Sequence, residues 1–182
     1  MTERRFVLEP LHEIAPELVL AKGGPTVSEL LKNLSALRIR PVGNSPEECE
    51  EAATALNRLM PSLTEDYTAL KAADVARMLS TGLTRIYLGR DESGKVQAGA
   101  TLVLCCSPTG CKAWIEDVAV MPDCRRRGYG RAIIRFLIAE SQRLGAKSLN
   151  LTSQPKREAA NALYRSEGFV LRETNVYRWQ EK

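Results

Sequence analysis

One stretch decides the fold: Val118-Ala119-Val120-Met121-Pro122-Asp123-Cys124-Arg125-Arg126-Arg127-Gly128-Tyr129-Gly130. The spacing of apolar residues changes there from the period of a strand to that of a helix. Downstream, apolar residues recur at helical spacing at Ile134, Leu137, Ile138 and Leu144. The first amides of a helix lack internal partners, and the helix dipole adds positive charge. Glycines at 128 and 130 let an anion approach the main chain. The stretch predicts a strand-to-helix turn that can bind phosphate.

The spacing of the glycines separates this turn from two common nucleotide sites. A dinucleotide fingerprint requires glycine or alanine where this chain has Ile133, and a Walker loop requires Gly-Lys-Ser/Thr, which is absent. One acid, Asp123, lies among five basic residues, Arg125, Arg126, Arg127, Arg131 and Arg135. Such a local positive field favours a phosphate-bearing ligand. A solvated basic helix end is the alternative interpretation.

Upstream of the turn, the sequence predicts one strand, two helices and three further strands. A strand is expected near 37–41, followed by a helix that Ser45-Pro46-Glu47-Glu48 starts as a capping box and Pro61 stops. A second helix is expected over about 70–79. Strands at 86–88, 96–106 and 113–121 are separated by short turns, which is typical of antiparallel neighbours.

Downstream of the turn, the helix ends at Gly145 and a strand follows at 149–152. Strand, helix and strand in this order predict a right-handed parallel crossover. Another helix runs from Pro155 to Gly168, and two short strands near Phe169 and 176–179 are expected to pair. The order β-α-α-β-β-β-α-β-α-β-β predicts an α/β (α+β layered) fold with one mixed central sheet. We assign residues 36–182 to this domain.

Residues 1–35 are interpreted as an N-terminal extension, with a short strand at 6–8 and a short helix at 27–34. Charged residues interrupt the first 20 positions and no apolar run is long enough to cross a bilayer, so we expect no secretion signal, no membrane partner and a cytoplasmic location. Five cysteines and one histidine without paired C-x-x-C spacing predict reduced thiols and no metal. Aromatic residues are 5% and not interleaved with the arginines, which argues against nucleic acid despite the net charge of +4.

Two motifs resemble those of the GNAT superfamily of N-acetyltransferases. Arg125-x-x-Gly128-x-Gly130 resembles its coenzyme A motif, R/Q-x-x-G-x-G/A, and Arg157 to Tyr164 followed by Gly168-Phe169 resembles its later motif, N-x-x-A-x-x-x-Y ending in G-F. The resemblance covers about 36–182. It implies a GNAT-like sheet in which a splayed strand pair holds the cofactor. It also implies an enzyme that transfers acetyl from acetyl-CoA to a primary amine.

The resemblance further implies which residues contact acetyl-CoA. Amides of 126–130 would hold the pyrophosphate, and the strand before them would pair with the pantetheine arm. The residues implied are Val118, Val120, Arg125, Arg126, Arg127, Gly128, Tyr129, Gly130, Arg131 and Asn161. One departure is Arg157, which stands where the later motif has asparagine, while Asn161 lies one helical turn out of register. The charge of Arg157 suits a cofactor phosphate instead.

Two residues match catalytic positions of the family. Tyr164 matches a tyrosine that protonates the leaving thiolate, with a core aromatic as the alternative. Glu116 resembles a glutamate that deprotonates the amine, often through water, with a structural carboxylate as the alternative. In a regular strand Glu116 shares a face with Val118 and Val120, and Asp117 points to the other face. A backbone amide near Val118 is expected to hold the oxyanion.

The acceptor is expected to be an amine of a small molecule or peptide, bound by 61–67 and 174–179 as the resemblance implies. Glu65 and Asp66 suit a cationic amine, although acids in the first turn of a helix are the plainer interpretation. The sequence leaves a homodimer open. The alternative function is a non-catalytic acyl-CoA-binding or regulatory module that keeps the turn and turns nothing over.

Overall fold

The computed structural model describes residues 5–24, 26–28 and 37–181, in two units that are treated separately below, Met1–Thr152 and Ser153–Lys182. The first unit contains the following elements: α1 (Arg5–Ile14), β1 (Arg38–Pro41), α3 (Pro46–Leu59), the 3-10 turn η1 (Met60–Ser62), α4 (Ala72–Ser80), β2 (Thr84–Arg90), β3 (Val96–Ser107), β4 (Gly110–Val120), the 3-10 turn η2 (Pro122–Cys124), α5 (Tyr129–Arg143) and β5 (Leu149–Leu151). The second unit contains α6 (Glu158–Ser166). The predicted mixed α/β fold is confirmed.

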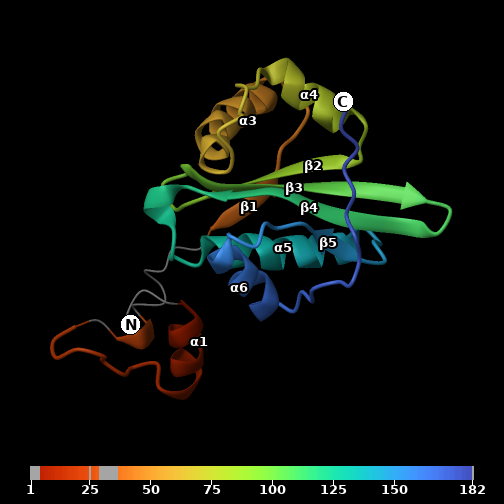
Figure 1. The fold of residues 1–182 in the computed structure, drawn as a ribbon. Coiled ribbons are helices and arrows are strands. Elements are labelled where there is room, and N and C mark those ends of the chain that lie inside the picture. The colour runs from red at the N-terminus through yellow and green to blue at the C-terminus, as the bar shows by residue number, and fades with distance from the viewer. Residues whose placement is uncertain (1–4, 25, 29–36, 182) are drawn as a thin grey trace. The chain divides into compact units, whose positions relative to one another are not determined.

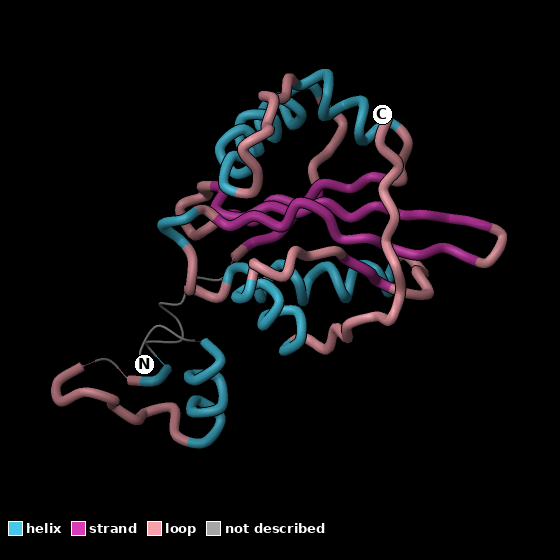
Figure 2. Tube along the Cα trace, viewed as in Figure 1, coloured by secondary structure: helices cyan, strands magenta, loops and turns pink. Residues whose placement is uncertain are grey.

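The first unit is built on a five-stranded sheet with the order β1-β2-β3-β4-β5. Neighbouring strands are antiparallel up to β4, whereas β4 and β5 are parallel and joined through α5. The β3–β4 hairpin extends beyond the ends of the other strands, as the tube view shows (Figure 2). The sheet thus combines a meander with one crossover, and the predicted phosphate turn lies inside that crossover.

Local sequence signals explain why α3 begins where it does. The Ser45 hydroxyl accepts from the Glu48 amide, and the Glu48 carboxylate accepts from the Ser45 amide, so the predicted capping box forms. Gly43 lies directly against this carboxylate, and a Cβ at Gly43 would come within 2.0 Å of Glu48 Oε2. The cap therefore requires glycine at position 43.

Helices cover both faces of the sheet in the first unit (Figure 1). On one face α3 and α4 enclose a core that includes Leu56, Leu59 and Val75 and the sheet residues Ile86 and Leu88. On the other face lies α5, whose Ile133, Ile134 and Leu137 are fully buried. Burial of these apolar faces drives the layering.

Tyr87 joins the sheet to α5. Its ring is fully buried and meets Phe136 edge to face at 5.2 Å, and its hydroxyl donates to Glu140 Oε1 at 2.8 Å. Arg143 donates to both oxygens of the same carboxylate at 2.7 and 2.8 Å. These bonds from Arg143 first, and then from Tyr87, lower the pKa of Glu140 although burial opposes the shift. Burial raises the pKa of Tyr87, with its bond to Glu140 adding to the effect.

Two local predictions were wrong. Residues 6–8 belong to α1 rather than to a strand, because the apolar residues Val7, Leu8 and Leu11 continue at helical spacing. The described residues after α6, 167–181, contain no strand, and their side chains at Leu171, Tyr177 and Trp179 are exposed. The helix expected at 27–34 lies mostly outside the described residues.

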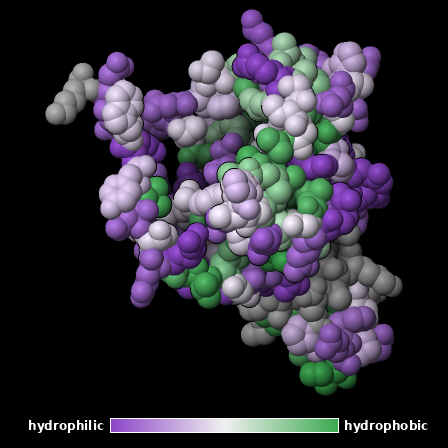
Figure 3. Space-filling model, turned by 90° about the vertical axis from the view of Figure 1, so that its right-hand side faces the viewer, coloured by the Kyte–Doolittle hydropathy of each residue, from purple (hydrophilic) through white to green (hydrophobic). Residues whose placement is uncertain are grey.

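One pair of cysteines also differs from the expectation of reduced thiols. Cys106 and Cys111 face each other in the β3–β4 ladder and form a disulfide, while Cys49, Cys105 and Cys124 are free. The hairpin brings the pair together, because cross-strand neighbours have adjacent Cβ atoms. No described helix is long and apolar enough to cross a membrane. Hydrophilic and hydrophobic residues are interspersed on the face drawn in Figure 3, and the mean hydropathy of the chain is −0.23.

Candidate active site

The turn between η2 and α5 has the backbone geometry of an anion site. Arg126 has φ +66° and Gly128 has φ +82°, so two residues of the turn are left-handed. Gly128 is the N-cap of α5, and no side chain of the described residues caps this helix. Left-handed residues alternating with ordinary ones turn successive amides toward one point, and the helix start adds to the field. The turn can therefore cradle a phosphate group.

The side chains of the turn divide between surface and core. Arg125, Arg126 and Arg127 are exposed, and Arg125 Nε donates to the Val120 carbonyl oxygen at 3.4 Å, which ties the turn to the end of β4. Tyr129 is buried, with 3% of its surface exposed. Any contact of Tyr129 with a ligand at this turn would therefore come from its backbone.

A buried glutamine anchors the turn from behind. Gln97 of β3, 5% exposed, accepts through its backbone oxygen from the Met121 amide at 2.9 Å and through Oε1 from the Cys124 thiol at 3.3 Å. Its Nε2 donates to Asp91 Oδ2 at 2.6 Å. Hydrogen bonds from Ser93 and then from Gln97 lower the pKa of Asp91 to about 2. Burial raises the pKa of the Cys124 thiol, which keeps it protonated and able to donate.

The strand before the turn is open on one side. β4 pairs with β5 only from Ala113 to Ile115, and β4 continues to Val120 without a β5 partner in the described chain. The implied divergence of the two strands stays a prediction, because β5 itself ends at Leu151. Backbone groups of 116–120 on that side can pair with an extended ligand instead.

A β-bulge interrupts this stretch of β4 and changes the predicted facing of its side chains. Thr101 pairs with Glu116 and Gly99 with Ala119, so the register shifts across Asp117, whose φ is +53°. The β3 partner of Glu116 also pairs with Ile86 of β2, and the β3 partner of Ala119 also pairs with Leu88. Cross-strand neighbours share a face, so Glu116 and Ala119 both lie on the α3–α4 face of the sheet.

Val120, by contrast, pairs with Ala98 on the α5 face. The prediction that Glu116 shares a face with Val120 was therefore wrong, because the extra residue in the bulge resets the alternation.

Glu116 and Asp117 are both exposed, yet their electrostatics differ from those of isolated acids. Partial burial first, and then the Asp117 charge, raise the pKa of Glu116 above its ordinary value. Burial also raises the pKa of Tyr67 in the α3–α4 loop, and the Asp117 charge adds to that shift. Asp117 thus raises the pKa of both groups.

The second unit carries the other motif. Tyr164 is half-buried on α6 and meets Phe169 edge to face at 6.0 Å. Burial raises its pKa, against a smaller opposing effect of Arg157. Asn161 Nδ2 donates to the Gln154 carbonyl oxygen at 2.9 Å, which fixes the segment before α6.

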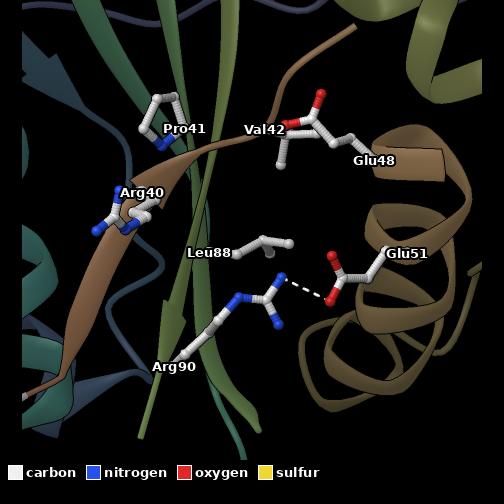
Figure 4. A pocket seen from close by; sticks show the side chains of 7 residues that line it. All are labelled: Arg40, Pro41, Val42, Glu48, Glu51, Leu88 and Arg90. Carbon is white, nitrogen blue, oxygen red and sulfur yellow. Dashed lines mark ion pairs between the residues drawn. The ribbon is translucent and has the colours of Figure 1, made fainter. Parts of the chain in front are cut away.

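A surface pocket of the first unit is lined by residues of β1, β2 and α3 and of the segment after β1 (Figure 4). Arg40 and Arg90 come from the strands and Glu48 and Glu51 from α3, with an ion pair of 2.8 Å between Arg90 Nη2 and Glu51 Oε1. None of residues 116–131 lines it. The described residues contain no group of three or more His, Cys, Asp or Glu that could hold a metal ion.

The sequence analysis singled out neither Gln97, which anchors the turn, nor Asn57, whose side-chain amide bonds both backbone groups of Leu70, and it placed Asp117 in a regular strand rather than in a bulge. A signal existed for the first two, since each is a polar residue inside an otherwise apolar pattern, in β3 and on the buried stripe of α3. The structure brings the predicted turn residues together with the open edge of β4 in one unit.

Known proteins share this architecture. In solved structures, 81% of the chain superposes on an aminoglycoside acetyltransferase, HMB0005, from an uncultured soil metagenomic sample, with a TM-score of 0.69, 22% identity and 99% of that chain covered. Ribosomal-protein-alanine N-acetyltransferase from Brucella melitensis biovar Abortus 2308 matches 81% of the chain with a TM-score of 0.64, 16% identity and full coverage. These likenesses show the fold.

A similar sequence segment occurs in [ribosomal protein bS18]-alanine N-acetyltransferase of Escherichia coli (strain K12). It is 41% identical over 58 residues, which is 32% of this chain and 39% of that protein, so the match spans well under half of the relative. The model of the acetyltransferase (GNAT) family matches residues 53–169, which include the turn, the bulged strand and the whole second motif. This match covers more than half of the chain, and the chain therefore belongs to the acetyltransferase (GNAT) family.

Proposed function

We propose that this protein transfers the acetyl group of acetyl-CoA to a primary amine by direct attack of the amine on the thioester. The observation that carries the proposal is the left-handed turn at Arg126 and Gly128 entering an α5 without a side-chain cap. The amides of 126–130 would hold the pyrophosphate, with Arg125, Arg126 and Arg131 as supporting charges. The open edge of β4 at Val118 and Val120 would hold the pantetheine arm.

Three groups of the protein each have one task in the proposed chemistry: Glu116, the amide near Val118 and Tyr164. The amine nitrogen forms a bond to the thioester carbon, and the bond from carbon to sulfur breaks. Glu116, directly or through water, takes the proton that the amine loses, and its raised pKa suits a base. The amide near Val118 binds the oxygen that becomes negative.

Tyr164 donates a proton to the departing sulfur in this proposal. Its pKa is raised by burial, so the phenol stays protonated at neutral pH. A thiol has an ordinary pKa of about 8.5, and a proton donor at the sulfur therefore assists departure of the thiolate. Asn161 and Arg157 of the same unit are proposed to contact the cofactor, although the Asn161 amide already bonds Gln154.

The acceptor is proposed to be an amine of a small molecule or peptide. Proteins similar to this one are described as acting on the alanine of a ribosomal protein or on aminoglycosides. We propose residues 36–182 as the acetyltransferase domain, residues 1–35 as an extension, and the cytoplasm as the place of action.

The experiment is acetyl-CoA turnover with a panel of amines, read as free thiol and as acetylated product by mass spectrometry. The panel contains a peptide with N-terminal alanine, the aminoglycoside sisomicin, and glucosamine 6-phosphate. We expect thiol and acetylated amine in equal amounts with at least one member. If CoA stabilises the fold and no amine yields thiol, the alternative of a non-catalytic acyl-CoA-binding module replaces this proposal.

A further inference from the structure

A buried side-chain amide connects the turn between β2 and β3 with the segment that enters the cofactor turn. Gln97 and Ser141 are the buried polar residues of the described chain. The Gln97 amide has one partner at each end, since Nε2 donates to Asp91 Oδ2 at 2.6 Å and Oε1 accepts from the Cys124 thiol at 3.3 Å. A buried amide that is bonded at both ends holds its two partners at a fixed separation.

Asp91 decides which end of the Gln97 amide faces Cys124. Asp91 Oδ1 accepts from the amides of Ser93 and Lys95 at 3.0 and 3.1 Å, which fixes the carboxylate within the β2–β3 turn. The pKa of Asp91 is about 2, so at neutral pH both of its oxygens only accept hydrogen bonds. Gln97 must therefore present its NH₂ group to Asp91 and its oxygen to Cys124. Position 124 consequently has to supply a hydrogen-bond donor.

The thiol of Cys124 is kept as that donor. Burial first, and then the charge of Asp123, raise the pKa of the thiol, so it stays protonated at neutral pH. The Asp123 carboxylate is a second acceptor beside the same thiol. Both groups that face the sulfur are thus acceptors, and a residue without a donor would leave the buried Gln97 oxygen unsatisfied.

These bonds hold the short segment from which the cofactor turn starts. Gln97 binds both ends of η2, because its backbone oxygen accepts from the Met121 amide at 2.9 Å and its side chain accepts from Cys124. Arg126, the first left-handed residue of the turn, comes two positions after Cys124. Loss of the side-chain bond would free the end of η2 next to the turn and leave only the backbone bond at Met121.

We propose that Asp91, Gln97 and Cys124 are positioning residues for the cofactor, which hold the turn at 126–130 in its CoA-binding conformation before CoA arrives. The inference rests on the proposed function, in which this turn binds the pyrophosphate. It extends that function to a connected set of side chains that begins in the turn between β2 and β3.

The consequence is a change in the affinity for CoA. A ligand that binds only the held conformation has an apparent Kd that rises as the population of that conformation falls. Loss of one hydrogen bond of ordinary strength changes such a population about tenfold, so Kd for CoA rises about tenfold. Bound CoA restores the turn. At saturating acetyl-CoA, kcat and KM for the amine therefore stay within about twofold.

Three substitutions separate the hydrogen bonds from packing. Gln97→Met keeps the length of the side chain and removes both bonds, so Kd for CoA is expected to rise about tenfold. Cys124→Ser keeps a donor, and its Kd is expected to stay within about threefold of that of the unaltered protein. Cys124→Val is apolar and has no donor, so it is expected to resemble Gln97→Met. A role in packing alone would give the opposite order, because a buried site without a partner favours valine over serine.

The test combines isothermal titration of CoA with hydrogen–deuterium exchange on the full chain. Ser141→Ala is the matched control, since it removes the other buried polar group, whose hydroxyl donates to the Ile138 carbonyl oxygen at 2.8 Å within α5. We expect this control to bind CoA within about twofold of the unaltered protein. Gln97→Met and Cys124→Val are expected to exchange faster at 121–130 without CoA and to regain protection at saturating CoA.

An affinity for CoA in Gln97→Met equal to that of Ser141→Ala would overturn the inference. So would tighter binding of CoA by Cys124→Val than by Cys124→Ser, a comparison that also decides the matter if Gln97→Met does not fold. If the unaltered protein does not bind CoA, the proposed function fails. The exchange rates at 121–130 then still decide whether Gln97 and Cys124 hold the turn.

Discussion

Replacing Gly128 with alanine tests whether the left-handed turn is the cofactor site. Gly128 has φ +82°, a conformation that glycine adopts freely and alanine does not. Gly145 provides a matched control, because it has φ +72° just beyond the other end of α5 and no atom lies within 4 Å of a Cβ placed there. The helix between them has 15 residues and is about 22 Å long, so the two positions lie at opposite ends of it.

The two substitutions carry the same backbone strain and different functional consequences. A left-handed alanine costs about 1–2 kcal/mol relative to its preferred conformation. Alanine also lowers the conformational entropy of the unfolded chain, which offsets part of this strain. Each variant is therefore expected to lose about 1 kcal/mol of unfolding free energy. In Gly128→Ala the added Cβ would also crowd a phosphate bound to the amides of the turn. Loss of one hydrogen bond to the charged phosphate, worth about 1.5 kcal/mol, weakens CoA binding by about tenfold.

The assay is isothermal titration of CoA into each variant, with thermal unfolding measured on the same samples. We expect Gly145→Ala to bind CoA like the unaltered protein while unfolding at a lower temperature. Equal CoA affinity in Gly128→Ala and Gly145→Ala would refute the assignment of the turn, provided that both variants show the loss of stability.

Three other predictions concern titrating groups. Asp117→Asn is expected to move the acid limb of the pH profile of kcat/KM to lower pH, because the Asp117 charge adds to burial in raising the pKa of Glu116. Glu116→Gln should abolish that limb. An acid limb that does not move in Asp117→Asn would exclude Glu116 as the titrating base. Tyr87→Phe should cost about 1.5 kcal/mol at neutral pH, since it removes a hydrogen bond to a carboxylate. The pKa of Glu140 is lowered in the folded state, so the stability that this bond contributes is present above the ordinary pKa of 4.5 and is lost as the pH falls below 4.5 through the lowered pKa. Denaturant unfolding measures the stability difference between the unaltered protein and Tyr87→Phe at pH 7 and at pH 4. An equal difference at the two pH values would contradict this prediction. Tyr164→Phe is expected to lower kcat without weakening CoA binding, and an unchanged kcat would remove Tyr164 from the mechanism.

Local signals in the sequence predicted most of the first unit. Ser45 and Glu48 marked the start of α3 because a capping box requires residue types at fixed spacing. The apolar period on either side of Gly128 located β4 and α5. These features depend on neighbours within a few positions, which a sequence displays directly.

The misread features depend on partners far along the chain. The bulge at Asp117 arises from the pairing of β4 with β3, and a run of acidic and apolar residues does not show where a register shifts. The bonds from Asn57 to Leu70 and from Gln97 to Cys124 likewise join distant residues. The strand expected at 176–179 had the right residue types, but strand propensity reflects packing on a partner more than an intrinsic preference.

A crystal structure of the complex with CoA tests the central claim most directly. We predict electron density for the pyrophosphate against the amides of 126–130, with the pantetheine arm along β4 from 116 to 120 and its sulfur on the side of Glu116. Density for CoA at another place, such as the pocket between Arg40 and Arg90, with the turn empty, would contradict the assignment of the turn and of the chemistry that depends on it.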